Sequence, residues 1–162
     1  MTAWELIRRF NLNQLVRLAW LMMRHPLYVF PTLKATQETL RICNKRYGDL
    51  HHKNGKANAF RHALWNLLLC RYVYQKSKNT EKAEGWAERV TDLHERLAPN
   101  EKLDTAMDLH NNKVGRMLFT GHPIQTMTDA IESLQRMTQE AKPVSDAKNI
   151  TNFEGELVYI AS

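Results

Sequence analysis

The stretch that decides the fold is KANAFRHALWNLLLCRYVYQK, residues 56–76. Drawn as a helix, it carries apolar side chains on all sides and not along one stripe: Phe60, Ala63, Leu64, Trp65, Leu67, Leu68 and Leu69. A helix that is apolar all round belongs inside a domain and not on its surface. The segment therefore predicts a buried central helix against which the rest of the chain packs.

Working outward from it, the apolar spacing and the end signals predict further helices on both sides. They are expected at about 2–10, where Thr2 and Glu5 have capping-box spacing, at about 11–25, after Pro31 up to Gly48, and at about 80–97, 101–119 and 124–140. Residues 49–55 read as a polar loop, and the tail from Ala141 reads as irregular, with an isolated extended run at 157–160.

These elements predict an all-α fold, a single compact domain of about seven helices around the central helix 56–76, with an irregular C-terminal tail. The domain spans 1–162. Residues 1–50 form basic, aromatic-rich N-terminal helices, residues 55–118 form the core that bears the distinctive polar residues, and residues 141–162 form the tail. Cys43 and Cys70 lie far apart and in no CxxC pair, which argues against a disulfide framework and a zinc ribbon.

Positive charge is concentrated at the N-terminus. Residues 1–56 contain ten Lys or Arg against three Asp or Glu, within a chain of net charge +6. Such a segment faces either phosphate groups, of a membrane or a nucleic acid, or only water. No nucleic-acid-binding module accompanies it, and the start lacks the pattern of a signal peptide, so a cytoplasmic protein is expected, free or peripherally bound to a membrane.

Aromatic residues interleave with the arginines of this N-terminal third. The mixture is typical of a helix lying on an anionic membrane surface: Trp4, Arg8, Arg9, Phe10, Arg17, Trp20, Arg24, Tyr28 and Phe30. The apolar run 18–23 is far shorter than the roughly 20 residues that a spanning helix needs. The alternative is that these aromatic side chains pack onto the core.

Polar residues on the central helix mark a candidate site. Asn58, His62 and Asn66 are spaced by four residues and form one stripe, which is costly on so apolar a helix unless the groups are paired or used. The next two helices each direct one histidine, His94 and His110, toward an apolar face. The three histidines either converge as metal ligands or acid–base groups, or pack separately as structural residues.

The helix expected at 101–119 has a second unusual face, formed by Asp104, Asp108, Asn111, Asn112 and Gly115. A glycine inside a helix costs about 1 kcal/mol relative to alanine, which indicates close approach of another backbone or of a ligand. By contrast, Glu95 is about 100° round its helix from His94 and is expected toward the polar flank.

Three blocks carry a resemblance: NAFRHALW at 58–65, His94-Glu95, and MDLHNN at 107–112 followed by VGR at 114–116. Together they resemble an uncharacterised bacterial helical domain family that is also found in polymorphic-toxin-like proteins. The resemblance implies a hydrolase. Its signature positions would be Arg61, His62, His94, Glu95, Asp108, His110 and Asn111.

The leading hypothesis is a hydrolase of a phosphoester or lipid-type substrate, with or without a divalent metal such as Zn or Mn. Its catalytic candidates are His62, His94, Glu95, Asp108 and Arg61, and its metal-ligand candidates are His62, His94 and His110. The binding candidates are Asn58, Asn66, Asn111, Asn112 and Arg116. The alternative is a non-enzymatic helical module that binds a membrane surface or a protein through the N-terminal third.

Overall fold

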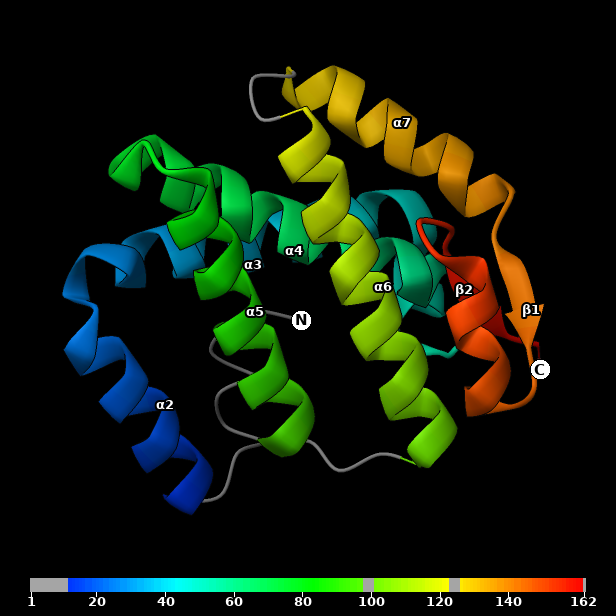
Figure 1. The fold of residues 1–162 in the computed structure, drawn as a ribbon, viewed down its shortest axis with the longest axis horizontal. Helices are drawn as coiled ribbons and strands as arrows, with labels where there is room; N and C mark the ends of the chain where they lie inside the picture. The colour runs from blue at the N-terminus through cyan, green and yellow to red at the C-terminus, as the bar shows by residue number, and fades with distance from the viewer. Residues whose placement is uncertain (1–11, 98–100, 123–125, 162) are drawn as a thin grey trace.

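The central helix forms where the sequence predicts it. In a computed structural model that describes residues 12–97, 101–122 and 126–161, α4 spans Lys56–Ser77. The side chains of Leu64, Leu68 and Val73 are fully buried. The helices α3 (Pro26–Tyr47), α5 (Thr80–Leu97), α6 (Lys102–Gly121) and α7 (Met127–Gln139) all contact α4 (Figure 1). The predicted all-α single domain is thereby confirmed.

α4 and α6 approach each other closely at Gly115. A Cβ atom built on Gly115 would lie 2.1 Å from the main-chain oxygen of Ala63 and 2.7 Å from its Cα. Real Cβ atoms do not approach backbone so closely, so only glycine fits here. The sequence indicated that either another backbone or a ligand lies against Gly115. The structure shows that it is the backbone of α4.

Several predicted boundaries need correction. α3 begins at Pro26 and not after Pro31. Proline is tolerated at the first helical position, because the N–H there has no partner inside the helix. Pro31 lies inside the helix and is buried, so the helix lacks one internal N–H donor there but keeps its packing. The predicted polar loop contains a 3-10 helix, η1 (Gly48–His52), in which buried His51 bonds Asn44 through Nε2 at 2.7 Å.

The C-terminal tail is more ordered than predicted. β1 (Lys142–Val144) pairs in parallel with β2 (Val158–Ile160), and the 3-10 helix η2 (Ala147–Phe153) connects them. The expected extended run at 157–160 is therefore not isolated. Its partner was missed because three residues that contain a proline show no strand periodicity of their own.

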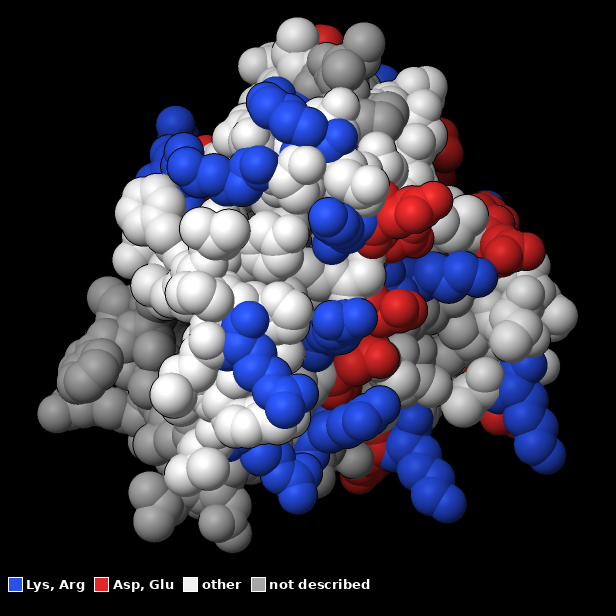
Figure 2. All heavy atoms as spheres, turned by 60° about the vertical axis from the view of Figure 1, so that its left-hand side comes forward, with Lys and Arg blue, Asp and Glu red and all other residues white. Residues whose placement is uncertain are grey.

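α2 (Leu12–Arg24) and the first half of α3 form one side of the molecule, on the left of Figure 1. Figure 2 turns this side forward and shows uncharged atoms over much of its left and centre, with Lys and Arg among them. The helix expected at 2–10, including Trp4, Arg8, Arg9 and Phe10, lies outside the described residues. No helix within the described parts of the chain is long and apolar enough to cross a membrane.

The contact at Gly115 leads to a stability prediction. We expect Gly115→Ala to lower the free energy of unfolding by about 1–3 kcal/mol or more, because the new methyl group would meet the backbone of α4. The control is Gly85→Ala in α5, where no atom lies within 4 Å of the added Cβ and alanine should stabilise the helix by about 0.5–1 kcal/mol. Urea unfolding of both variants measures the difference; equal effects would contradict the close approach.

Candidate functional site

His62 lies at the centre of the candidate site, buried in the middle of α4. Its Nε2 is 2.8 Å from a guanidinium nitrogen of Arg61, and its Nδ1 is 3.2 Å from Oδ1 of Asn112. A guanidinium only donates, so Nε2 must accept and Nδ1 must carry the proton that is donated to Asn112. The two contacts therefore select one neutral tautomer, with a lone pair on Nε2.

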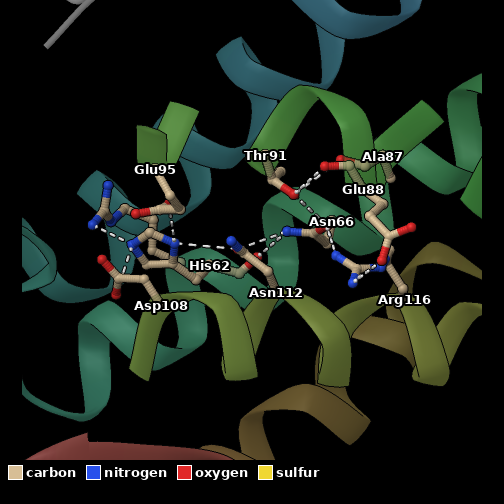
Figure 3. Close-up of polar contacts among 10 residues, drawn as sticks. His62, Asn66, Ala87, Glu88, Thr91, Glu95, Asp108, Asn112 and Arg116 are labelled. Carbon is tan, nitrogen blue, oxygen red and sulfur yellow. Dashed lines mark hydrogen bonds and ion pairs between the residues drawn. The ribbon is translucent and has the colours of Figure 1, made fainter. Parts of the chain in front are cut away.

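Two carboxyl groups approach the imidazole of His62 from neighbouring helices. Figure 3 shows Glu95 of α5 on one side of the ring and Asp108 of α6 on the other. Oδ1 of Asp108 lies 3.2 Å from Nε2 of His62, and Oε1 of Glu95 lies 3.9 Å from Nδ1. One ligand atom from each of the three residues fits within a span of 4.8 Å.

Both of these carboxyl oxygens are buried and have no hydrogen-bond partner. Oδ1 of Asp108 also faces Nε2 of His62, a nitrogen that already acts as an acceptor. Two acceptors at 3.2 Å repel each other unless a proton or a cation lies between them. Either a proton on Asp108, whose pKa burial raises to about 7, or a bound cation would remove this repulsion.

Burial shifts proton affinities throughout the cluster. It raises the pKa of Glu95 to about 8, with help from nearby Asp108, and that of Asp108 to about 7 against the opposing charge of Arg61. It lowers the pKa of His94 to about 4 and that of His62 well below its usual value, and Arg61 lowers both further. Near neutral pH the imidazoles are uncharged, and the two carboxyl groups retain protons that ordinary ones would lose.

A small cavity opens beside this cluster. Its volume of about 30 Å³ is enough for one or two water molecules. Its lining includes Arg61, His62 and His94, so two of the three predicted histidines share one cavity. Trp65 forms another part of the lining and is fixed by a hydrogen bond from Nε1 to Oγ1 of Thr36 at 3.0 Å.

Amide side chains anchor the other side of His62 (Figure 3). Asn66 donates from Nδ2 to the main-chain oxygen of His62 at 3.1 Å and to Oδ1 of Asn112 at 2.7 Å. Its own Oδ1 accepts from Arg116 at 3.1 Å and from Thr91 at 3.3 Å. Asn66, Asn112 and Arg116, predicted as binding residues, thus form a buried network that holds the imidazole in place.

Three other predicted residues do not join the cluster. Asn111 uses both ends of its side chain on the main chain of Val158, at 2.9 and 3.0 Å, and so fixes β2 against α6. His110, predicted as a metal ligand, directs Nε2 at the main-chain oxygen of Glu156 at 2.8 Å. Asn58 is buried, with an Oδ1 that has no hydrogen-bond partner.

Sequence reasoning missed Thr91 and Glu88, which extend the network along α5. Glu88 binds Arg116 at 3.2 Å, and Thr91 binds Asn66. Thr91 lies four residues before Glu95 and therefore on the same face of α5, a signal that the sequence did contain. Glu95 was expected toward the polar flank, but its side chain is only 3% exposed because α4 and α6 cover that face.

Residues 19–142 match the family described as a domain of unknown function, DUF6973. The chain belongs to this family. The match extends from α2 to the first residue of β1 and includes every residue of the His62 cluster. No curated protein and no solved structure matches the chain, and the family assigns no reaction.

The raised carboxyl pKa values predict how stability depends on pH. The folded state binds the protons of Glu95 and Asp108 more tightly than the unfolded state, so stability must fall as pH rises toward 8. The lowered pKa values of His62 and His94 act in the opposite direction, but their contribution is complete above about pH 6.5. We therefore expect the free energy of unfolding, measured with urea in the presence of EDTA, to decrease between pH 6.5 and 8.

Two variants test the assignment of this decrease. Glu95→Gln should flatten the profile, because it removes the carboxyl group whose pKa reaches about 8. Glu132→Gln, at an exposed position on α7, should leave the slope unchanged. A profile of the wild-type protein that is flat or rises over this range would disprove the proton affinities described for the cluster.

Proposed function

We propose that the domain is a divalent-metal-dependent hydrolase of a phosphoester or lipid-type substrate, with His62, Glu95 and Asp108 as the metal ligands. The supporting observation is the set of three buried ligand atoms within 4.8 Å, two of which are carboxyl oxygens without a hydrogen-bond partner. This set differs from the ligands proposed from the sequence, His62, His94 and His110. His110 is replaced because its Nε2 bonds the main-chain oxygen of Glu156. A cation here would also separate the two facing acceptors of His62 and Asp108.

The donor atoms suit zinc or manganese. Two ligands at about 2.0–2.1 Å from a tetrahedral zinc ion lie about 3.3 Å apart, close to the 3.2 Å between Nε2 of His62 and Oδ1 of Asp108. One imidazole and two carboxylates form the mixed nitrogen and oxygen set that these ions accept. Three protein ligands leave a coordination position for water or substrate, as in catalytic zinc sites. Arg61 would have to release Nε2 of His62 for the ion to bind.

The lining of the cavity suggests a role for each remaining residue. Arg61 carries a positive charge that can hold the anionic group of a phosphoester. A bound metal would polarise that group and lower the pKa of a water molecule. His94 is neutral near pH 7, so it can accept the proton that water loses as its oxygen bonds to phosphorus. His94 would then give this proton to the leaving oxygen as the bond between that oxygen and phosphorus breaks. The reaction consumes one water molecule.

The resemblance of the three sequence blocks to domains of toxin-like proteins supports the same proposal, since a hydrolase is what that resemblance implies. The contacts around His62 support it independently, because Asn112 accepts from Nδ1 of the imidazole and is itself held by Asn66. Metal-binding histidines generally need such a partner for the nitrogen that does not bind the metal. Here Asn112 already accepts from Nδ1, which leaves Nε2 for the ion. Glu95, whose Oε1 lies 3.9 Å from Nδ1, would have to turn toward Nε2 to join it.

Metal binding by untagged protein tests the proposal. Calorimetric titration with Zn²⁺ or Mn²⁺ should give one site per chain, with release of protons from Glu95 and Asp108 because the cation displaces them. Asp108→Asn and Glu95→Gln should each weaken binding by at least about tenfold. The same variants should lose metal-dependent hydrolysis of bis(p-nitrophenyl) phosphate or of a phospholipid.

Asp104→Asn is the matched control, because Asp104 lies one turn before Asp108 on α6 and bonds Asn54 at 2.9 Å. It should bind metal like the wild-type protein. The metal site is disproved if Asp108→Asn and Glu95→Gln bind the metal ion as tightly as the control does. It is also disproved if the wild-type protein binds neither Zn²⁺ nor Mn²⁺.

A further inference from the structure

Large apolar side chains are exposed along one side of α2 and α3. We call this side the α2–α3 face and define it by Val16, Trp20, Met23, Leu27, Phe30 and Leu33. Met23, Leu27 and Phe30 are 80%, 78% and 70% exposed. The other large apolar side chains with high exposure in the described chain are scattered over other elements, as on any soluble protein. A concentration such as this one marks an interaction surface.

The charges on this face all have one sign. Residues 12–37 include no Asp or Glu, whereas Arg17 and Arg24 are exposed among the apolar side chains. Lys34 is also exposed, with its Nζ 4.4 Å from the centre of the Tyr72 ring. The guanidinium carbon of Arg24 lies 3.7 Å from the centre of the Trp20 ring. In Figure 2 the acidic side chains gather toward the right of the view, away from the broad uncharged area. The face therefore combines apolar contact area with uncompensated positive charge.

A groove continues the α2–α3 face toward α5. Its volume is about 520 Å³, and its apolar lining comes from Val16, Trp20, Leu21 and Leu93. The charged lining consists of three arginines and one aspartate: Arg17, Arg89, Arg96 and Asp92. A hollow with apolar walls and an excess of guanidinium groups is suited to an anionic amphiphile, whose chain and headgroup need these two environments.

We propose that the α2–α3 face docks onto an anionic lipid bilayer. Trp and Phe side chains enter the boundary between headgroups and acyl chains, and exposed Arg and Lys contact lipid phosphates. A second copy of the chain fits this face less well, because a symmetric contact would press Arg17, Arg24 and Lys34 against their own copies. The 13 residues of α2 are too few to span the bilayer, so the contact lies in the plane of the membrane.

The bilayer contact would lie next to the cavity beside His62. Leu33 of the face is three residues, or about one helical turn, from Thr36, which lines that cavity. Leu93 of the groove directly precedes His94, which also lines it. A lipid held at the face would therefore bring its phosphate near Arg61. This last consequence rests on the proposed hydrolase, whereas the bilayer contact itself does not.

Sedimentation with vesicles tests the contact without measuring hydrolysis. The whole protein should sediment with vesicles that contain 30 mol% phosphatidylglycerol in phosphatidylcholine at about 0.05 M salt, and much less at 1 M, where the Debye length is about 3 Å. Arg17→Gln with Arg24→Gln should weaken the partition coefficient by about 30-fold, because two cations are removed from the surface. Leu27→Ser with Phe30→Ser should also weaken it, since both side chains are exposed and not needed in the core.

The control removes the same charge elsewhere. Lys102→Gln with Lys148→Gln takes two exposed cations from the start of α6 and from η2. In Figure 1, α2 is at the lower left, α6 runs from the centre to the lower right and η2 is at the right. This double variant should bind vesicles nearly as the wild-type protein does. The proposal is overturned if the wild-type protein does not sediment with vesicles at low salt, or if the control loses as much vesicle binding as Arg17→Gln with Arg24→Gln does. It is also overturned if the wild-type protein is a dimer in solution, Leu27→Ser with Phe30→Ser makes it a monomer, and neither protein binds vesicles.

Discussion

The close contact of α4 with α6 at Ala63 and Gly115 is the constraint on which the rest of the structure depends. It brings two backbones together without a side chain between them, so the residues beside the contact are forced against each other. His62 directly precedes Ala63, and Asn112 lies three residues before Gly115. The hydrogen bond between these two side chains and the approach of Asp108 to the imidazole follow from this single crossing.

The burial of so many polar groups makes the cluster costly, and the pattern of satisfied and unsatisfied groups is informative. On one side of His62, Asn66 pairs with Thr91, Asn112 and Arg116, and among these four side chains only Nδ2 of Asn112 is a buried polar atom without a partner. On the other side, the carboxyl oxygens that face the imidazole lack partners. A core that existed only for stability would gain by filling that side with apolar groups. This difference between the two sides supports the proposed metal site.

The proposed metal site and the α2–α3 face both bear on how a buried metal centre would reach an anionic substrate. The cavity beside His62 accommodates only one or two water molecules, so a substrate of the proposed hydrolase would have to present its reacting group at the edge of the domain. α3 connects the two features, because Thr36 lines the cavity and Leu33 is exposed one turn away. A protein held at a surface by that face would keep its cavity next to the surface.

The sequence by itself determined the helices whose signals are local. The bounds of α4 and α5 were predicted to within one residue, because apolar periodicity and end signals act over a few turns. Local signals failed at Pro31, where tertiary burial keeps a helix intact through a proline. They also failed at the site: His62 and Asp108 were found, but the sequence directed His110 inward and Glu95 outward. Periodicity shows which residues share a face, whereas only the packing of α4 against both α5 and α6 decides which faces are covered.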